Sequence, residues 1–317
     1  MKYSLRVSSI WECGGRCDAK GNPQQEDSLY PAYGKQTDAD RTFILCDGMG
    51  GHDAGEVASA AVCHAMSRSI MTDGHDIEGI FTDKDFNKAL NAAFDALQRE
   101  DSGSEKPMGT TLAFLKLHSA GATIAHIGDS RVYHIRPGET AAQTRILFVT
   151  DDHSLVNGLV KLGQMTPEEA HLSPQRNIIT RAMQPCTPSE RPEADVYHTA
   201  DIQPGDWFYL CSDGMLESCS MENGNGIRAV FSKEGGDMDN KTHLLREATA
   251  ANSDNHSALI IQILDVTREP AQSEGANHVP SAVAPVKRKS SSVLVLFLLV
   301  LVLLVCVLVA VAVLWFS

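Results

Sequence analysis

The sequence lacks paired cysteine motifs. None of its 8 cysteines belongs to a Cys-x-x-Cys pair, so neither a zinc ribbon nor a disulfide framework is expected. Cys46, Cys211 and Cys306 lie within apolar runs, which is typical of buried thiols in a reducing compartment. Cys13 and Cys17 could contribute to a metal site, but no second pair with matching spacing accompanies them.

The chain also lacks an excess of positive charge. Its formal net charge is −13, which disfavours binding to nucleic acid because phosphate backbones attract basic surfaces. An acidic protein is compatible with carboxylates gathered around divalent cations, although acidic residues that keep a surface soluble explain part of the same charge. With 317 residues, the chain is long enough for one large domain or two modest ones.

Two further features are missing at the ends of the sequence. The first residues have no apolar core of the kind found in a signal peptide. After Lys289 no charged side chain occurs, and residues 293–316 form an unbroken apolar run. A helix of this length would span about 36 Å, enough to cross a bilayer. The basic cluster at 287–289 should stay in the cytoplasm. We therefore expect a single-pass membrane protein with a cytoplasmic domain.

The rest of the chain alternates short apolar runs with amphipathic stretches. Short apolar or alternating runs predict strands, and apolar residues at spacings of three and four predict helices. Strands are expected at 1–12, 43–46, 110–117, 122–127, 132–135, 145–149, 207–211 and 257–264, and helices at 54–71, 85–97, 154–162 and 241–251. This pattern favours an α+β fold in which packed antiparallel sheets are flanked by helices, rather than a βαβ repeat.

One local pattern occurs twice. The apolar runs at 43–46 and 207–211 are each followed by an Asp-Gly pair, which begins at Asp47 and at Asp213. A carboxylate at the end of a buried strand needs a cation or a hydrogen-bond partner, and glycine lets backbone carbonyls approach a ligand closely. Either pattern alone is compatible with an ordinary turn. Their recurrence favours a functional site.

Four aspartates share a position at the edge of a predicted strand: Asp27, Asp47, Asp213 and Asp254. Asp129 is a candidate fifth. If these side chains converge, their mutual repulsion requires cations. Oxygen ligands favour Mg²⁺ or Mn²⁺ over zinc. Two such ions, about 3.5–4 Å apart, activate a bridging water and stabilise both ends of an in-line displacement at phosphorus.

Eight ordered motifs connect these aspartates with a known family. They are Gln-Glu-Asp-Ser (25–28), Asp-Gly-Met-Gly-Gly-His-x-Ala-Gly-Glu-Val-Ala-Ser (47–59), Gly-Thr-Thr (109–111), Gly-Asp-Ser-Arg-Val-Tyr (128–133), Thr-x-Asp-His-Ser-Leu-Val (150–156), Arg-Asn-Ile-Ile-Thr-Arg-Ala (176–182), Leu-Cys-Ser-Asp-Gly (210–214) and Asp-Asn (254–255). With them, residues 3–265 resemble the bacterial metal-dependent protein phosphatases of the protein phosphatase 2C family. Each motif is weakly specific alone, but eight in the family's order are not expected by chance.

The resemblance implies a fold and a set of site residues. The implied fold is a four-layer α-β-β-α sandwich of two antiparallel sheets flanked by helices, with metal ions in a cleft at one end. Asp47 would bridge two Mn²⁺ or Mg²⁺ ions. The carbonyl of Gly48 would ligate one of them. Asp213 and Asp254 would complete the first ion, and Glu26 or Asp27 would serve the second, directly or through water. Asp129 with Asp213 would hold a third, weaker ion. His52 would be the general acid that protonates the leaving alkoxide.

The resemblance also implies a mobile flap and reveals one departure. Residues 157–181 resemble the segment that tunes substrate access in the family. The family commonly places a phosphate-binding arginine five residues before the acid that corresponds to Asp27, and this chain has Asn22 there. Arg16 or Lys20 could replace that arginine, or the metal ions alone could hold the phosphate.

These observations lead to one main hypothesis and two alternatives. We expect a serine/threonine phosphatase that is tethered to a bacterial inner membrane, acts on phosphoproteins and opposes a cognate kinase. The expected parts are a catalytic domain at 1–266, a flexible linker at 267–292 and a transmembrane helix at 293–316. A catalytically weak regulator that binds phosphoproteins is one alternative, and hydrolysis of a small phosphate ester is the other.

Overall fold

A computed structural model describes residues 1–17, 21–50, 54–72, 79–101, 103, 107–218 and 224–268. Met1–Glu269 forms one compact unit. Within the described ranges, no helix combines the length and the apolar character that a bilayer crossing requires. Lys20, His52, and the predicted linker and transmembrane helix beyond residue 268 all lie outside these ranges, so their predicted roles stay predictions.

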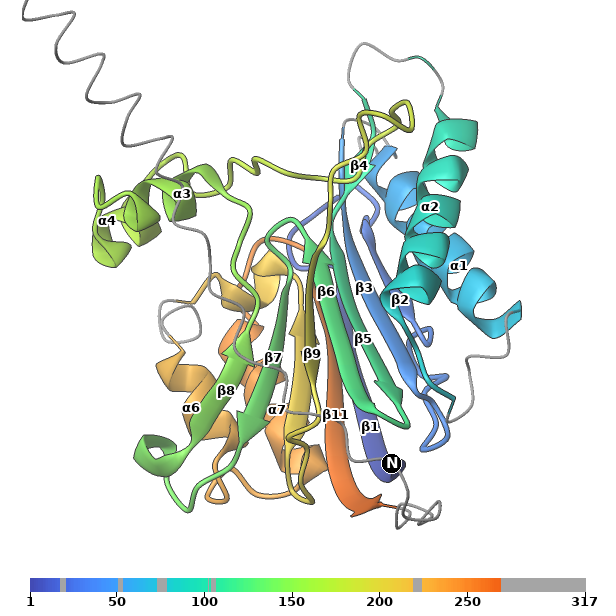
Figure 1. Cartoon of the computed structure of the whole chain (residues 1–317). Helices are drawn as coiled ribbons and strands as arrows, with labels where there is room; N and C mark the ends of the chain where they lie inside the picture. Colours follow the sequence, from blue (N-terminus) through green and yellow to red (C-terminus); the bar gives the residue numbers. More distant parts are fainter. Residues whose placement is uncertain are drawn as a thin grey trace, which may run out of the picture. The chain divides into compact units, whose positions relative to one another are not determined.

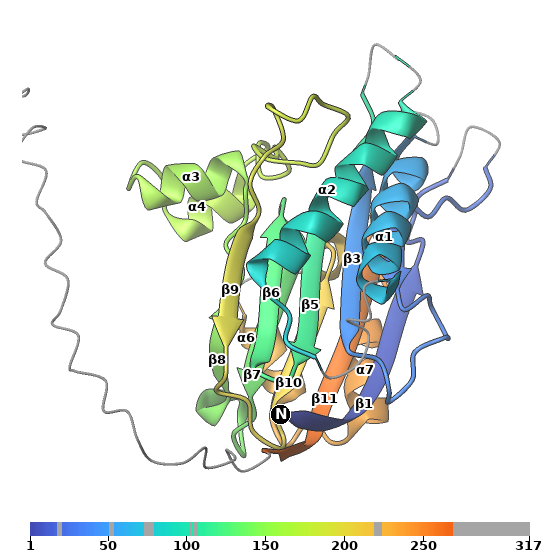
Figure 2. The same cartoon turned by 45° about the vertical axis from the view of Figure 1, so that its right-hand side comes forward.

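Two antiparallel sheets form the centre of the unit (Figures 1 and 2). The first has the order β1 (Lys2–Glu12), β11 (His256–Thr267), β10 (Trp207–Cys211), β7 (Arg131–Arg136) and β8 (Arg145–Val149). The second has the order β2 (Asp27–Tyr30), β3 (Thr42–Met49), β5 (Leu112–His118), β6 (Gly121–Ile127) and β9 (Asp195–Thr199), and β4 (Gly109–Thr110) pairs with the end of β3. The first and the last described strands, β1 and β11, therefore lie side by side in one sheet.

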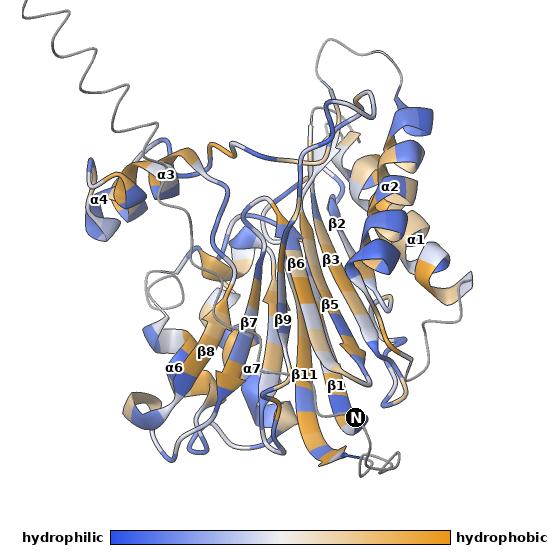
Figure 3. Cartoon of the chain, in the orientation of Figure 1, coloured by the Kyte–Doolittle hydropathy of each residue, from blue (hydrophilic) through white to orange (hydrophobic). Residues whose placement is uncertain are grey.

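Alternation of apolar side chains along the strands builds three layers of core (Figure 3). On β3, Phe43 and Leu45 point between the two sheets, whereas Ile44 and Cys46 point to the opposite face. On β10, Phe208 and Leu210 enter the central layer, whereas Trp207, Tyr209 and Cys211 enter an outer one. Because both faces of these strands are buried, they consist of continuous apolar runs.

Two pairs of helices cover the outer faces of the sheets (Figure 2). Helices α1 (Ala54–Thr72) and α2 (Asp83–Glu100) pack on the sheet that contains β3, through residues such as Val62 and Phe94. Helices α6 (Asn225–Phe231) and α7 (Met238–Thr249) pack on the other sheet through residues such as Phe231 and Leu245. The predicted arrangement of two antiparallel sheets flanked by helices is confirmed.

A third pair of short helices lies outside these layers. Helix α3 (Leu155–Lys161) begins after the N-cap Ser154, and α4 (Pro167–Leu172) begins after Thr166, whose capping box with Glu169 is complete. Both belong to the segment predicted as the flap. The segment returns to the sheets beside its starting point, because the amide of Leu155 donates to the carbonyl of Ile178 (2.8 Å).

Three details differ from the predictions. Strand β3 does not end at Asp47 but continues to Met49, because β4 supplies partners for its last two residues. Helix α7 begins after the N-cap Asp237, before the predicted start at Lys241. Helix α6 was not predicted, since it has only 7 residues and a glycine N-cap with no side-chain cap.

Candidate metal centre

Two of the predicted site aspartates lie side by side on neighbouring strands. Asp27 is the first residue of β2, and the register of the sheet places it directly opposite Asp47 of β3. Side chains of directly opposed residues lie about 4.5–5.5 Å apart at Cβ. The amide of Gly48 donates to the carbonyl of Glu26 (3.1 Å) and continues this contact. Sheet pairing alone therefore brings together two acids that are 20 positions apart in the sequence.

The backbone of Asp47 is held by the Gly-Thr-Thr motif. The amide of Thr111 and the hydroxyl of Thr110 donate to the Asp47 carbonyl at 2.9 and 2.8 Å. The Asp47 amide donates in turn to the Thr111 hydroxyl (3.0 Å), which also lies 2.6 Å from the hydroxyl of Ser130. The Gly-Thr-Thr motif therefore supports the backbone of the candidate metal ligand Asp47.

The other three predicted ligands come from turns and a loop at the ends of strands. Asp129 lies in the turn between β6 and β7, Asp213 follows β10, and Asp254 precedes β11. They line a common pocket of about 70 Å³. Asp152 and Glu217 also line it, so acidic side chains dominate the pocket wall. Asp27 and Asp47 are not among the lining residues of this pocket.

The proximity of these carboxylates shifts their pKa values. Asp47 is partly accessible, but the surrounding protein and the charges of Asp27, Asp213, Asp129 and Asp254 raise its pKa well above the usual range. Burial, followed by the charges of Asp213 and Asp254, raises the pKa of Asp27 to about 7. Burial and the charge of Asp254 raise the pKa of Asp213 to about 6. Such mutual repulsion is relieved by bound cations.

The residues present fit hard divalent cations. The predicted donor set consists of oxygens alone, which suits Mg²⁺ or Mn²⁺. Among the described residues, one buried oxygen of Asp27 and one of Asp129 (Oδ1 in each) have no hydrogen-bond partner. A buried carboxylate oxygen without a partner is costly unless a ligand supplies one. The close packing of the backbone here requires glycine at position 48, because a Cβ would lie 2.2 Å from the carbonyl oxygen of Gly55.

Several residues that hold the aspartates were not predicted. The hydroxyl of Ser212 donates to Asp27 Oδ2 (2.9 Å). The Asn255 side chain accepts from the amide of Glu26 (2.8 Å) and donates to the carbonyls of Cys13 (2.9 Å) and Gln24 (2.8 Å). Ser212 belongs to the motif at 210–214 and Asn255 to the pair at 254–255. Their positions next to Asp213 and Asp254 are the feature of the sequence that could have predicted their roles.

Arg16 reaches the centre from the loop after β1. Its guanidinium binds both oxygens of Asp254, with Nε–Oδ1 and Nη2–Oδ2 distances of 2.7 and 3.0 Å, and lies 3.8 Å from Glu26. Among the described residues, Arg16 is thus the arginine of this loop that contacts the acids. Arg131, a second cation near the centre, is already bound to Asp152 at 2.8 and 2.6 Å.

A second group of possible metal ligands has another explanation. Ligand atoms of His126, His153 and Asp195 lie within 4.8 Å of one another. His153 Nδ1 accepts from the amide of Gly128 (3.0 Å), and its Nε2 lies 3.3 Å from Asp195. The guanidinium of Arg181 contacts both partners, with Nη1 3.1 Å from His153 Nε2 and 2.7 Å from Asp195. An arginine thus already supplies the positive charge, and the group is an ion-pair network.

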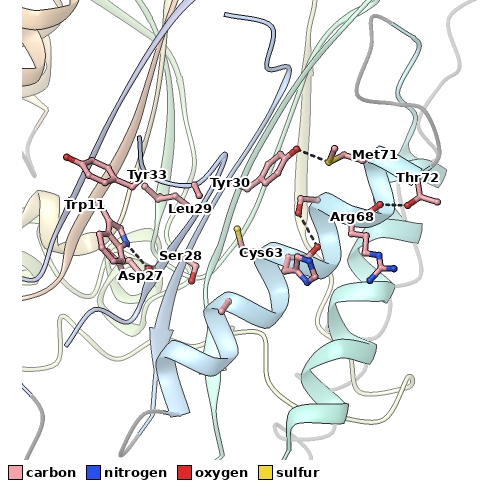
Figure 4. Close-up of a pocket in the computed structure, with 14 residues that line it drawn as sticks. Trp11, Asp27, Ser28, Leu29, Tyr30, Tyr33, Cys63, Arg68, Met71 and Thr72 are labelled. Atoms are coloured by element: carbon pink, nitrogen blue, oxygen red, sulfur yellow. Dashed lines mark hydrogen bonds between the residues drawn. The ribbon is translucent and has the colours of Figure 1, made fainter. Parts of the chain in front are cut away.

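A larger cavity of about 900 Å³ is lined by residues of β2 and α1 (Figure 4). Trp11, Tyr30 and Met71 are among its lining residues, and the indole of Trp11 donates to the carbonyl of Asp27 (2.9 Å). Its wall is mainly apolar, and Asp27 is the one carboxylate among its described lining residues. The smaller acidic pocket is therefore the better candidate for a catalytic centre, despite its size.

The fold and the carboxylate cluster together define a class of protein: a β-sandwich with an acidic, cation-binding pocket at the ends of its strands. Residues 13–233 match the family model for Protein phosphatase 2C. The chain therefore belongs to the protein phosphatase 2C family and is a serine/threonine protein phosphatase.

Relatives and solved structures agree with this membership. The chain is 34% identical over 230 residues to protein phosphatase PhpP of Streptococcus pneumoniae, which covers 71% of this chain and 87% of that protein. It is similar to the crystal structure of the Mycobacterium tuberculosis serine/threonine phosphatase PstP/Ppp, with a TM-score of 0.63, 29% identity, and coverage of 83% of this chain and 100% of that one. It is also similar to a structure of the catalytic domain of the serine/threonine protein phosphatase PstP in complex with two manganese ions. The TM-score is 0.62 and the identity 27%, and the match covers 83% of this chain and 100% of that one.

Proposed function

We propose that the chain hydrolyses phosphoserine and phosphothreonine on cytoplasmic proteins while a helix at 293–316 tethers it to a bacterial inner membrane. The observation that carries the chemistry is the gathering of five aspartates: Asp27 lies opposite Asp47 in the sheet, and Asp129, Asp213 and Asp254 line one pocket. The apolar run at 293–316 and the basic cluster before it support the tether. A cognate kinase that phosphorylates the same targets belongs to this proposal.

The aspartates would hold two Mn²⁺ or Mg²⁺ ions, with a third as a weaker addition. Asp47 and the carbonyl of Gly48 lie on β3, opposite Asp27, whereas Asp213 and Asp254 approach from the other sheet. When bound, such ions lower the pKa of a coordinated water and offset the negative charge of a phosphate. The protein contributes position: Ser212 fixes the Asp27 carboxylate, and Thr111 fixes the backbone of Asp47.

Turnover and metal binding together test this proposal. Purified protein with Mn²⁺ should hydrolyse both p-nitrophenyl phosphate and phosphothreonine peptides, and chelation of the metal should stop it. Asp213→Asn should lower turnover at least about a hundredfold and weaken Mn²⁺ binding in calorimetry, because one ligand oxygen loses its charge. Circular dichroism should show that the variant remains folded. If Asp213→Asn turned over substrate as fast as the wild type, Asp213 would not be a metal ligand. If the wild-type protein showed no turnover, the proposed phosphatase function would be refuted.

A further inference from the structure

A cavity of about 570 Å³ lies between the flap helices and the core, next to the acidic pocket. The two cavities share four lining residues: Arg131, Asp152, Ser154 and Val156. The second cavity therefore lies within reach of a peptide whose phosphate occupies the acidic pocket. Cavities of about 300–1,000 Å³ enclose small organic molecules, so this one has room for a large side chain.

The flap side of this cavity is partly apolar. Val156 and Val160 lie four residues apart and thus share one face of α3. Helix α4 contributes Pro167, Ala170 and Leu172, and also the polar Glu168 and His171. Val156 and Ala170 are buried, at 8% and 9% exposure, whereas Leu172 is 80% exposed. Figure 3 shows that both helices carry apolar as well as polar residues. Isolated exposed leucines are common, but here the exposed leucine lines the same cavity as the buried Val156 and Ala170.

The floor of the cavity has no unbalanced charge. Arg131 and Asp152 form a two-pronged ion pair at 2.8 and 2.6 Å, and their side chains are only 17% and 16% exposed. The Ser154 hydroxyl accepts from the amide of Asn157 as the cap of α3. These polar groups are already satisfied by one another, so the floor favours an uncharged guest over a second phosphate or a charged side chain.

We propose that this cavity, formed by α3, α4 and the Arg131–Asp152 pair, binds a large apolar side chain of the phosphoprotein substrate, a few residues from its phosphoserine or phosphothreonine. The inference rests on the proposed phosphatase function and adds the class of substrate. The cavity adjoins the acidic pocket and shares four lining residues with it, and neighbouring residues of an extended peptide are about 3.3–3.6 Å apart along the chain. A leucine or phenylalanine close in sequence to the phosphorylated residue therefore reaches it.

Matched phosphopeptides test the preference. Phosphothreonine peptides with a single leucine, alanine or aspartate scanned over the flanking positions are compared in kcat/KM with Mn²⁺ present. We expect leucine to exceed alanine roughly tenfold at one or two positions, which is the gain that burial of a leucine side chain provides, and aspartate to be the poorest there. Equal kcat/KM values for leucine and alanine peptides at every position would overturn the inference.

Two leucine variants then locate the effect. Leu172→Asp places a charge on the cavity rim, so the ratio of kcat/KM for the best leucine peptide to that for p-nitrophenyl phosphate should fall roughly tenfold. Leu162→Asp is the control, because Leu162 lies on the same flap and is 72% exposed but does not line the cavity. An equal fall in both variants, or no fall in Leu172→Asp, would overturn the inference.

The two proposals fail in different ways. Hydrolysis of p-nitrophenyl phosphate without any apolar preference among the peptides would leave the phosphatase function intact and remove the apolar subsite. No hydrolysis of either kind of substrate would remove both.

Discussion

At the scale of single residues, Arg16 competes with the divalent cations for Asp254. Arg16 binds both oxygens of Asp254, so a metal ion at Asp254 must displace the guanidinium or share the carboxylate with it. Half of the Arg16 side chain is exposed, and an exposed pair contributes at most about 1 kcal/mol. The arginine is therefore a weak competitor, and its main effect is to reduce repulsion when no metal is bound.

Replacement of Arg16 by alanine tests this competition. In EDTA-treated protein, Arg16→Ala should lower the melting temperature by a few degrees, because the carboxylates lose a cation. Calorimetry should show Mn²⁺ binding that is several-fold tighter, because Asp254 becomes free. Lys233→Ala, which removes a cation paired with Glu139 outside the centre, serves as the control and should leave Mn²⁺ binding unchanged. Weaker Mn²⁺ binding in Arg16→Ala would show that Arg16 assists the metal.

At the scale of elements, the contact between β3 and the chain that joins β4 to β5 positions Asp47. Thr111 is fully buried and accepts the amide proton of Asp47 (3.0 Å). In Thr111→Val this amide loses its acceptor, which should lower the free energy of unfolding by about 1–3 kcal/mol in urea titrations and weaken Mn²⁺ binding. Thr111→Ser keeps the hydroxyl and should recover most of both. A valine variant as stable as wild type would show that water or another group satisfies the amide.

Elements with strong local patterns could be predicted from the sequence. The run from Phe43 to Cys46 contains only apolar side chains because it is buried on both faces, and the same holds for the run at 207–211. The Asp-Gly pairs after these runs therefore located Asp47 and Asp213. The resemblance to a family then assigned ligand roles to the other predicted metal ligands, Asp27, Asp129 and Asp254. No local pattern in the sequence shows that these residues lie near Asp47 and Asp213.

Other features depend on contacts between distant segments and could not be predicted. Arg16 reaches Asp254 because the amide of Gly15 donates to the carbonyl of Ser253 (2.9 Å) and Asn255 binds Cys13. Helix α6 exists because its apolar side chains pack on the sheet, not because its seven residues favour a helix. A single sequence shows neither contact.

For the whole molecule, the tether and the phosphatase domain should be separable. The described part of the chain forms a compact unit that ends near Glu269, before the apolar run at 293–316. Deletion of residues 290–317 should move the protein from the membrane fraction to the supernatant and leave turnover of p-nitrophenyl phosphate unchanged. Sedimentation and activity of the two forms in parallel measure this. A full-length protein that stays in the supernatant would contradict the tether.

The stability of the metal-free molecule should depend on pH through the same aspartates. The pKa of Asp27 is raised to about 7, mainly by burial, from an ordinary value of 3.8. A raised carboxyl pKa means that the folded protein binds more protons than the unfolded chain between about pH 4 and pH 7, so its stability falls as the pH rises through this window. Burial lowers the pKa of His118 to about 4, which has the opposite sign up to about pH 6.5, so total stability does not isolate the effect.

A comparison with Asp27→Asn isolates it, because His118 contributes equally to both proteins. In EDTA, the melting temperature of the wild type minus that of the variant should fall by several degrees between pH 4.5 and pH 7.5, since only the wild type must ionise Asp27. Saturating Mn²⁺ should reverse the sign of this difference at pH 7.5, because the ionised carboxylate then binds a cation and the amide binds it poorly. A difference that is independent of pH in EDTA would mean that Asp27 ionises freely and that the carboxylates do not repel one another.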